Sequence, residues 1–86
     1  MDTGDAFEAI QAALEADPRR SVTNAFLDEM HFGNFAVSYR ENGESFSLVN
    51  DRSQLYLYRG PDDKDGTIIL SNLGGVDEEA VIAAIR

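Results

Sequence analysis

Cysteine is absent from this 86-residue sequence, which excludes disulfides, thiolate metal ligands and thiol catalysis. Histidine occurs once, as His31, so a zinc site built on two histidines is excluded as well. No apolar run approaches the roughly 18 residues that a membrane-spanning helix needs. The acidic start MDTGDAFEA lacks the basic and apolar regions of a signal peptide. We therefore expect a cytoplasmic protein with no membrane interaction.

Basic residues are also few, since seven Lys and Arg stand against sixteen Asp and Glu, for a formal net charge of −9. Affinity for nucleic acids rests on Lys and Arg contacts to phosphates, so direct nucleic-acid binding is not expected. An acidic surface favours encounter with a basic partner protein, including one that itself handles nucleic acid. The same acidity also serves simply to keep a small domain in solution. The chain is short enough to form a single domain over residues 1–86.

Helical periodicity marks the first third of the sequence. Asp5 followed by Glu8 resembles a capping box, and the apolar residues after it recur at helical spacing: Ala6, Phe7, Ile10, Ala13 and Leu14. This helix should end at Asp17, because the residue before a proline is disfavoured in helical conformation. A second helix is expected from Pro18 to Gly33, with Val22, Phe26 and Met30 at a spacing of four. Val22, Thr23 and Phe26 would also suit a strand.

From Phe35 onward the period changes to two, which predicts strands. Asn42-Gly43 is a strong signal for a two-residue hairpin turn, because both positions need positive φ. That turn pairs Glu41 with Glu44, Tyr39 with Phe46 and Val37 with Leu48. A second turn centred in residues 50–53 would pair Leu48 with Leu55 and Phe46 with Leu57. The two turns place the same apolar face toward the core.

A fourth strand is expected from Thr67 to Ser71, in one of two registers. Either Ile68 and Leu70 point inward or Ile69 does, and the first register is preferred because it buries two large residues. Asp77 can cap a last helix whose Val81, Ile82 and Ile85 face the sheet. The sequence thus predicts an α+β two-layer sandwich of order α-α-β-β-β-β-α, with a four-stranded antiparallel meander and helices packed on one face.

No segment carries a convincing catalytic, cofactor or metal signature. Aligning Gly66 with the glycine of an EF-hand loop leaves Pro61 and Asn72 at positions that need oxygen ligands and a glutamate. The loop of residues 60–66 is therefore interpreted as a turn. His31 has no accompanying nucleophile motif, and Gly74-Gly75 has no Lys-Ser or Lys-Thr after it. We expect no enzyme, no metal and no cofactor.

The outer face of the predicted sheet is distinctive because it contains no acidic residue. Tyr and Arg combine large contact area with hydrogen-bonding tips and are enriched at binding hot spots, although Tyr is also simply a good strand former. The whole face comprises Ala36, Ser38, Arg40, Ser45, Ser47, Val49, Gln54, Tyr56, Tyr58, Thr67 and Ile69. The predicted partner-binding residues are Tyr56, Tyr58, Arg40, Ser45, Ser47 and Ile69, with the loop residues Asp62, Asp63 and Asp65.

These observations favour a non-enzymatic protein-binding module. Small size and acidity are shared with inhibitors of the anti-CRISPR, toxin-antagonist and immunity classes, which block a larger protein that is basic or handles nucleic acid. The alternatives are a structural homodimer, an adaptor or secretion chaperone, or a small enzyme or ligand-binding domain that uses His31 and nearby carboxylates. The sequence is compatible both with binding through the acidic surface and with binding through the Tyr56/Tyr58 face.

Overall fold

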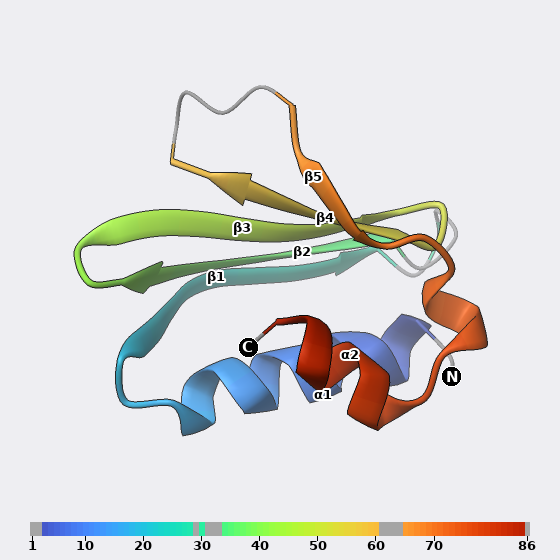
Figure 1. Ribbon diagram of the computed structural model, residues 1–86, viewed down its shortest axis with the longest axis horizontal. Helices are drawn as coiled ribbons and strands as arrows, with labels where there is room; N and C mark the ends of the chain where they lie inside the picture. The colour runs from blue at the N-terminus through green and yellow to red at the C-terminus, as the bar shows by residue number, and fades with distance from the viewer. Residues whose placement is uncertain (1–2, 29, 31–33, 61–64, 86) are drawn as a thin grey trace.

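The computed structural model describes residues 3–28, 30, 34–60 and 65–85. Five strands form one antiparallel sheet in chain order, and both helices lie on one side of it (Figure 1). The α+β class and the antiparallel sheet with helices on one face are confirmed, whereas the four-stranded count and the paired N-terminal helices are wrong. The elements are α1 (Thr3–Ala16), β1 (Arg20–Asp28), β2 (Asn34–Glu41), β3 (Glu44–Asp51), β4 (Gln54–Arg59), β5 (Thr67–Leu70), the 3₁₀ helix η1 (Leu73–Gly75) and α2 (Glu78–Ala84).

The helix expected from Pro18 to Gly33 is instead the edge strand β1 within the residues described. A helix would bury Phe26 and Met30, but these residues are 59% and 91% exposed. Asp17 does not cap a helix: its carboxylate accepts from the backbone N–H of Arg19 in a turn. Alternation in β1 is hidden by a bulge between Val22 and Asn24. Because a bulge adds one residue to a strand, it disguises the period of two.

Helix α1 supplies the apolar stripe that covers the inner face of the sheet. Ala6, Ile10 and Leu14 are fully buried, as their spacing predicts, and Phe7 and Ala13 pack against the same core. The capping-box interpretation of Asp5 is wrong, because the helix begins at Thr3 and Asp5 lies in its first turn, where a negative charge favours the helix dipole. It ends at Ala16, directly before the Asp17-Pro18 pair.

The first predicted hairpin is confirmed and the second is displaced by two residues. Asn42 and Gly43 have φ of 53° and 80°, and Glu41 pairs with Glu44. The second turn is tight because Arg52 and Ser53 take φ of 52° and 68°, an uncommon geometry for residues of these types. Leu48 therefore pairs with Leu57 rather than Leu55. A shift of two residues preserves the side of the sheet that each side chain occupies.

Strand β5 follows neither predicted register in full. Leu70 pairs with Leu55 on the inner side, but Ile68 pairs with Tyr56, and a register shift lies between the two pairs. Ile68 is half exposed, while Ile69 packs against the core. The preferred register is thus right for Leu70 and wrong for Ile68, and the outward placement of Ile69 is wrong. The bulge explains the difference, because both predicted registers assume unbroken alternation.

The C-terminal helix closes the core as expected. Asp77 Oδ1 accepts a hydrogen bond of 2.9 Å from the backbone N–H of Ala80, which caps α2. Val81 and Ile85 are buried beside α1, whereas Ile82, which was also expected to face inward, is only partly buried and is not part of the core cluster. The 3₁₀ helix η1 was not predicted, and its Leu73 is fully buried in the same core.

Candidate protein-binding face

The face of the sheet opposite α1 and α2, called here the outer face, is covered by no element among the described residues (Figure 1). Its side chains can be assigned because successive residues of a strand point to opposite sides, and the buried residues of each strand identify the inner side. Cross-strand pairing then groups the outer residues into rows that run across the sheet.

One of these rows is apolar over its whole width and spans all five strands. Its members pair in sequence from β1 to β5: Phe26, Ala36, Val49, Tyr56 and Ile68. The two ends of the row are prominent, since Phe26 is 59% exposed and Ile68 is 50% exposed. A contiguous apolar strip of this kind is unlike the scattered single hydrophobic residues that most surfaces carry. We call these five residues the apolar row.

The neighbouring row is polar but uncharged, and its side chains lie close to the sheet. Asn24, Ser38, Ser47 and Tyr58 pair in that order, and the hydroxyls of Ser38 and Ser47 are 3.0 Å apart and hydrogen-bonded. The ring of Tyr58 lies over Gly66, because a Cβ at residue 66 would be only 2.7 Å from its Cζ. Glycine is therefore needed at position 66 for this ring to lie flat.

The two tyrosines form a pair of large side chains on β4. Their ring centroids are 6.4 Å apart at an interplanar angle of 36°, and the Tyr56 hydroxyl donates to Gln54 Oε1 at 2.6 Å. On β2, the corresponding positions hold the small residues Ala36 and Ser38. The outer face thus has large side chains on β4 and small ones on β2, with Val49 and Ser47 between them on β3.

Charge on the outer face is sparse and separated. Arg40 lies at the Asn42-Gly43 end, where its guanidinium donates to the carbonyl of Gly43 at 3.3 Å. The prediction that the face has no acidic residue is wrong, because β1 and the displaced turn add Asp28 and Asp51 at the opposite end. The middle of the face, which holds the apolar row, has no charged side chain among the described residues.

Most of the predicted contact residues do lie together on this face, namely Tyr56, Tyr58, Arg40, Ser45 and Ser47. Ile69 does not lie on this face, because the bulge in β5 turns it toward the core. Thr67 was also assigned to the wrong side, since it pairs with Leu57 on the inner side. Asp62 and Asp63 lie outside the described residues, as does His31, and Asp65 is exposed just before β5. Phe26 and Ile68 were not predicted as contact residues, although an apolar residue at a sheet edge is a signal that could have found them.

The carboxylates gather on the other side of the molecule, around the helices. Asp5 and Glu8 of α1 and Asp77 and Glu78 beside α2 line an open groove of about 590 Å³. No group of three or more carboxylates or histidines among the described residues is arranged to hold a metal ion. These four carboxylates lie on the side of the molecule opposite the apolar row.

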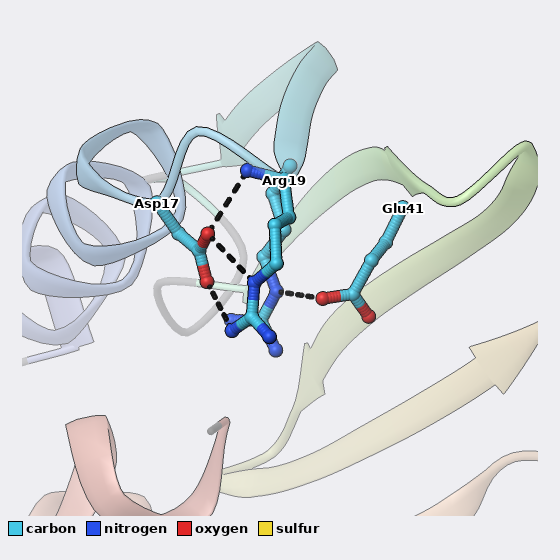
Figure 2. Close-up of polar contacts among 4 residues, drawn as sticks. Asp17, Arg19 and Glu41 are labelled. Atoms are coloured by element: carbon cyan, nitrogen blue, oxygen red, sulfur yellow. Dashed lines mark hydrogen bonds and ion pairs between the residues drawn. The ribbon is translucent and has the colours of Figure 1, made fainter.

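Near the start of β1, ion pairs fix the chain at the edge of the inner face (Figure 2). Two hydrogen bonds from the Arg19 guanidinium, of 3.1 and 2.8 Å, together with the one from its backbone N–H, lower the pKa of Asp17 to about 2. The neighbouring Arg20 pairs with Glu41 at 3.1 Å and lies over the ring of Tyr39, whose phenol pKa is raised by burial. The Arg20–Glu41 pair joins β1 to β2, and the Asp17–Arg19 pair holds the turn that leads into β1.

No protein-family model matches this chain, and no curated protein or solved structure matches it either. Within the part of the chain that the structure describes, no helix is long and apolar enough to cross a membrane. The case for function therefore depends on the outer face and on the distribution of charge.

Proposed function

We propose that this protein is a non-enzymatic protein-binding module whose contact surface is the outer face of its sheet. The observation that carries the proposal is the apolar row, which crosses five strands and has half-exposed Phe26 and Ile68 at its ends. Leaving such a strip in water forgoes the stabilisation that burial brings, about 25 cal/mol per Å² of apolar surface. A contact that covers the apolar row would gain this stabilisation.

The side chains around the apolar row suit recognition of a protein surface. Tyr56 and Tyr58 are already held by Gln54 and by the glycine beneath, so little rotamer freedom remains to be lost on binding. Ser38 and Ser47 satisfy each other, which lowers the cost of removing their hydroxyls from water. These features favour a contact that is ordered before the partner arrives.

We assign the protein to the inhibitor or immunity type, in which a small acidic chain blocks a larger basic protein. The support is the formal charge of −9, together with the four carboxylates of Asp5, Glu8, Asp77 and Glu78 that line one groove. A basic protein would be drawn to this groove, since complementary charge steers encounter, which makes the groove a second contact surface beside the outer face. The cytoplasm is the compartment that we propose for it, given the absence of cysteine.

The test of the outer face compares two tagged variants as bait in an extract of the source cell or its natural host. Phe26→Asp places a charge in the apolar row, and Ala83→Asp places the same charge on the exposed side of α2, outside the helical groove, as a matched control. Captured proteins are quantified by mass spectrometry against the unaltered chain. We expect a specific protein to be lost with Phe26→Asp and kept with Ala83→Asp.

An unchanged set of captured proteins with Phe26→Asp, in a variant shown to be folded by circular dichroism, would contradict the proposal. Repeating the capture across a salt series separates the two surfaces. A contact through the helical carboxylates weakens steeply as salt rises, because exposed charges are screened within about 8 Å at physiological ionic strength. A contact through the apolar row changes little.

A further inference from the structure

The outer face has large side chains on β4 and small ones on β2, on opposite sides of the central strand. We infer that the partner that covers this face is a second copy of this chain. The inference rests on the proposed function, because it takes the outer face to be a contact surface and names the partner. Two properties of the face support it: the placement of its large and small side chains, and its area.

A two-fold axis brings the large side chains of one copy opposite the small side chains of the other. Because the sheet has five strands, β3 is its centre, and an axis that runs along β3 places β2 of one copy over β4 of the other. The small residues Ala36 and Ser38 then face the partner copy's two tyrosines, so large side chains of each copy meet small ones of the other. Isologous contacts of this kind require a patch that is complementary to itself.

The same axis matches the two ends of the apolar row. It brings β1 of one copy over β5 of the other, so Phe26 lies against Ile68 at both margins. Val49 and Ser47 of β3 lie on the axis and meet their own counterparts, and both are small enough for close approach. The contact would then be an aligned sheet-on-sheet sandwich, in which the strands of the two sheets cross at about 30°.

The area is sufficient for a stable dimer of modest affinity. Five strands spaced about 4.8 Å apart, with an average of about seven residues at 3.4 Å each, cover roughly 570 Å² in projection. Side chains raise the accessible area above the projected area. Stable interfaces begin at about 600 Å² per partner, so a stable dimer would have to bury the whole outer face.

Pairing through this face brings Asp51 of β3 against its own counterpart on the axis, so charge opposes it at that end of the face. The same pairing directs both helical sides outward, which limits the repulsion between two copies that each carry −9. The molecule measures at least 21 Å along each principal axis, so the helical carboxylates of the two copies are separated by more than the Debye length of about 8 Å. The helical groove also stays open to a basic partner. Dimerisation should therefore strengthen as salt rises, whereas binding to a basic protein should weaken.

The test is a dilution series in sedimentation equilibrium, which reports the mass in solution. The unaltered chain is expected to reach twice the monomer mass at high concentration. Ala36→Tyr places a large side chain opposite the partner copy's Tyr56 and is expected to raise the dissociation constant by at least about tenfold, equivalent to about 1.4 kcal/mol. Combining Ala36→Tyr with Tyr56→Ala exchanges the large and the small residue in both copies, so the double variant is expected to recover the dimer.

Three results would overturn the inference: a monomer at every concentration, a dimer that tolerates Ala36→Tyr, or a double variant that stays monomeric. Ala12→Tyr on the exposed side of α1 is the matched control, and circular dichroism confirms that each variant is folded. If the unaltered chain is a monomer but Phe26→Asp still loses a captured protein, the dimer inference is refuted and the proposed function stands. If Phe26→Asp changed neither mass nor capture, the proposed function would fail as well.

Discussion

The hairpin between β3 and β4 stores backbone strain that substitution should release. Arg52 and Ser53 both have positive φ, and the left-handed region costs an ordinary residue roughly 1–2 kcal/mol. The other tight hairpin of this chain has the same geometry with Asn42 and Gly43. We therefore expect Arg52→Asn combined with Ser53→Gly to stabilise the protein.

The magnitude follows from two opposing effects. Relief of the left-handed backbone favours the variant, while the greater freedom of glycine in the unfolded chain costs about 0.5–1 kcal/mol. The contacts of the turn are kept, because Arg52 N donates to Asn34 Oδ1 and the carbonyl of Ser53 accepts from Leu73 N, and both use the turn's backbone atoms. The expected net gain is about 1–2 kcal/mol, or roughly 4–8 °C in melting temperature for each kcal/mol in a domain of this size.

Urea unfolding followed by circular dichroism measures this gain as a higher midpoint at an unchanged slope. The reciprocal variant, Asn42→Arg with Gly43→Ser, is the control and should lose a similar amount. An unchanged or lower midpoint for the Arg52→Asn, Ser53→Gly variant would refute the reasoning that the left-handed turn costs stability.

Three further perturbations test other parts of the structure. Asp77→Ala removes the side chain that caps α2 through Ala80 and should cost about 1 kcal/mol in urea unfolding, a loss that Asp77→Asn should largely avoid. Arg19→Gln should return the pKa of Asp17 from about 2 toward 3.8 in an NMR titration. Because that pKa is depressed in the folded state, the associated stability is present above pH 3.8 and is lost as the pH falls toward 2. Leu73→Ala should cost about 2–5 kcal/mol, since this side chain is fully buried; a cost below about 1 kcal/mol would contradict its place in the core.

Local rules predicted the parts of this fold in which the chain follows one period without interruption. The stripe of α1, the Asn42-Gly43 hairpin and the cap at Asp77 each depend on residues within a few positions of one another, and all three are confirmed. The inner and outer sides of β2, β3 and β4 were also assigned correctly, because a shift of two residues does not change sides.

The errors arise where the chain departs from a single period. The second turn was expected in residues 50–53, but its central pair, Arg52-Ser53, was not identified because neither residue favours positive φ. The helix expected across β1 rested on the spacing of four between Val22, Phe26 and Met30, but the bulge places Val22 on the inner side of the sheet and Phe26 on the outer side. Tertiary pairing with β2 decides the conformation of this segment, and that pairing cannot be seen in local spacing.

The two bulges that defeated prediction also shape the candidate site. Without the bulge after Val22, strict alternation would direct Phe26 into the core, and without the bulge at Ile69, Leu70 would join Ile68 outside. Each edge strand thus turns one large apolar side chain outward and keeps the next one inside. The results are the two ends of a single row, Phe26 on β1 and Ile68 on β5. Bulges at sheet edges commonly re-aim a side chain or protect an edge from pairing; here the first effect is visible, since the bulges place Phe26 on the outer side and keep Leu70 on the inner side.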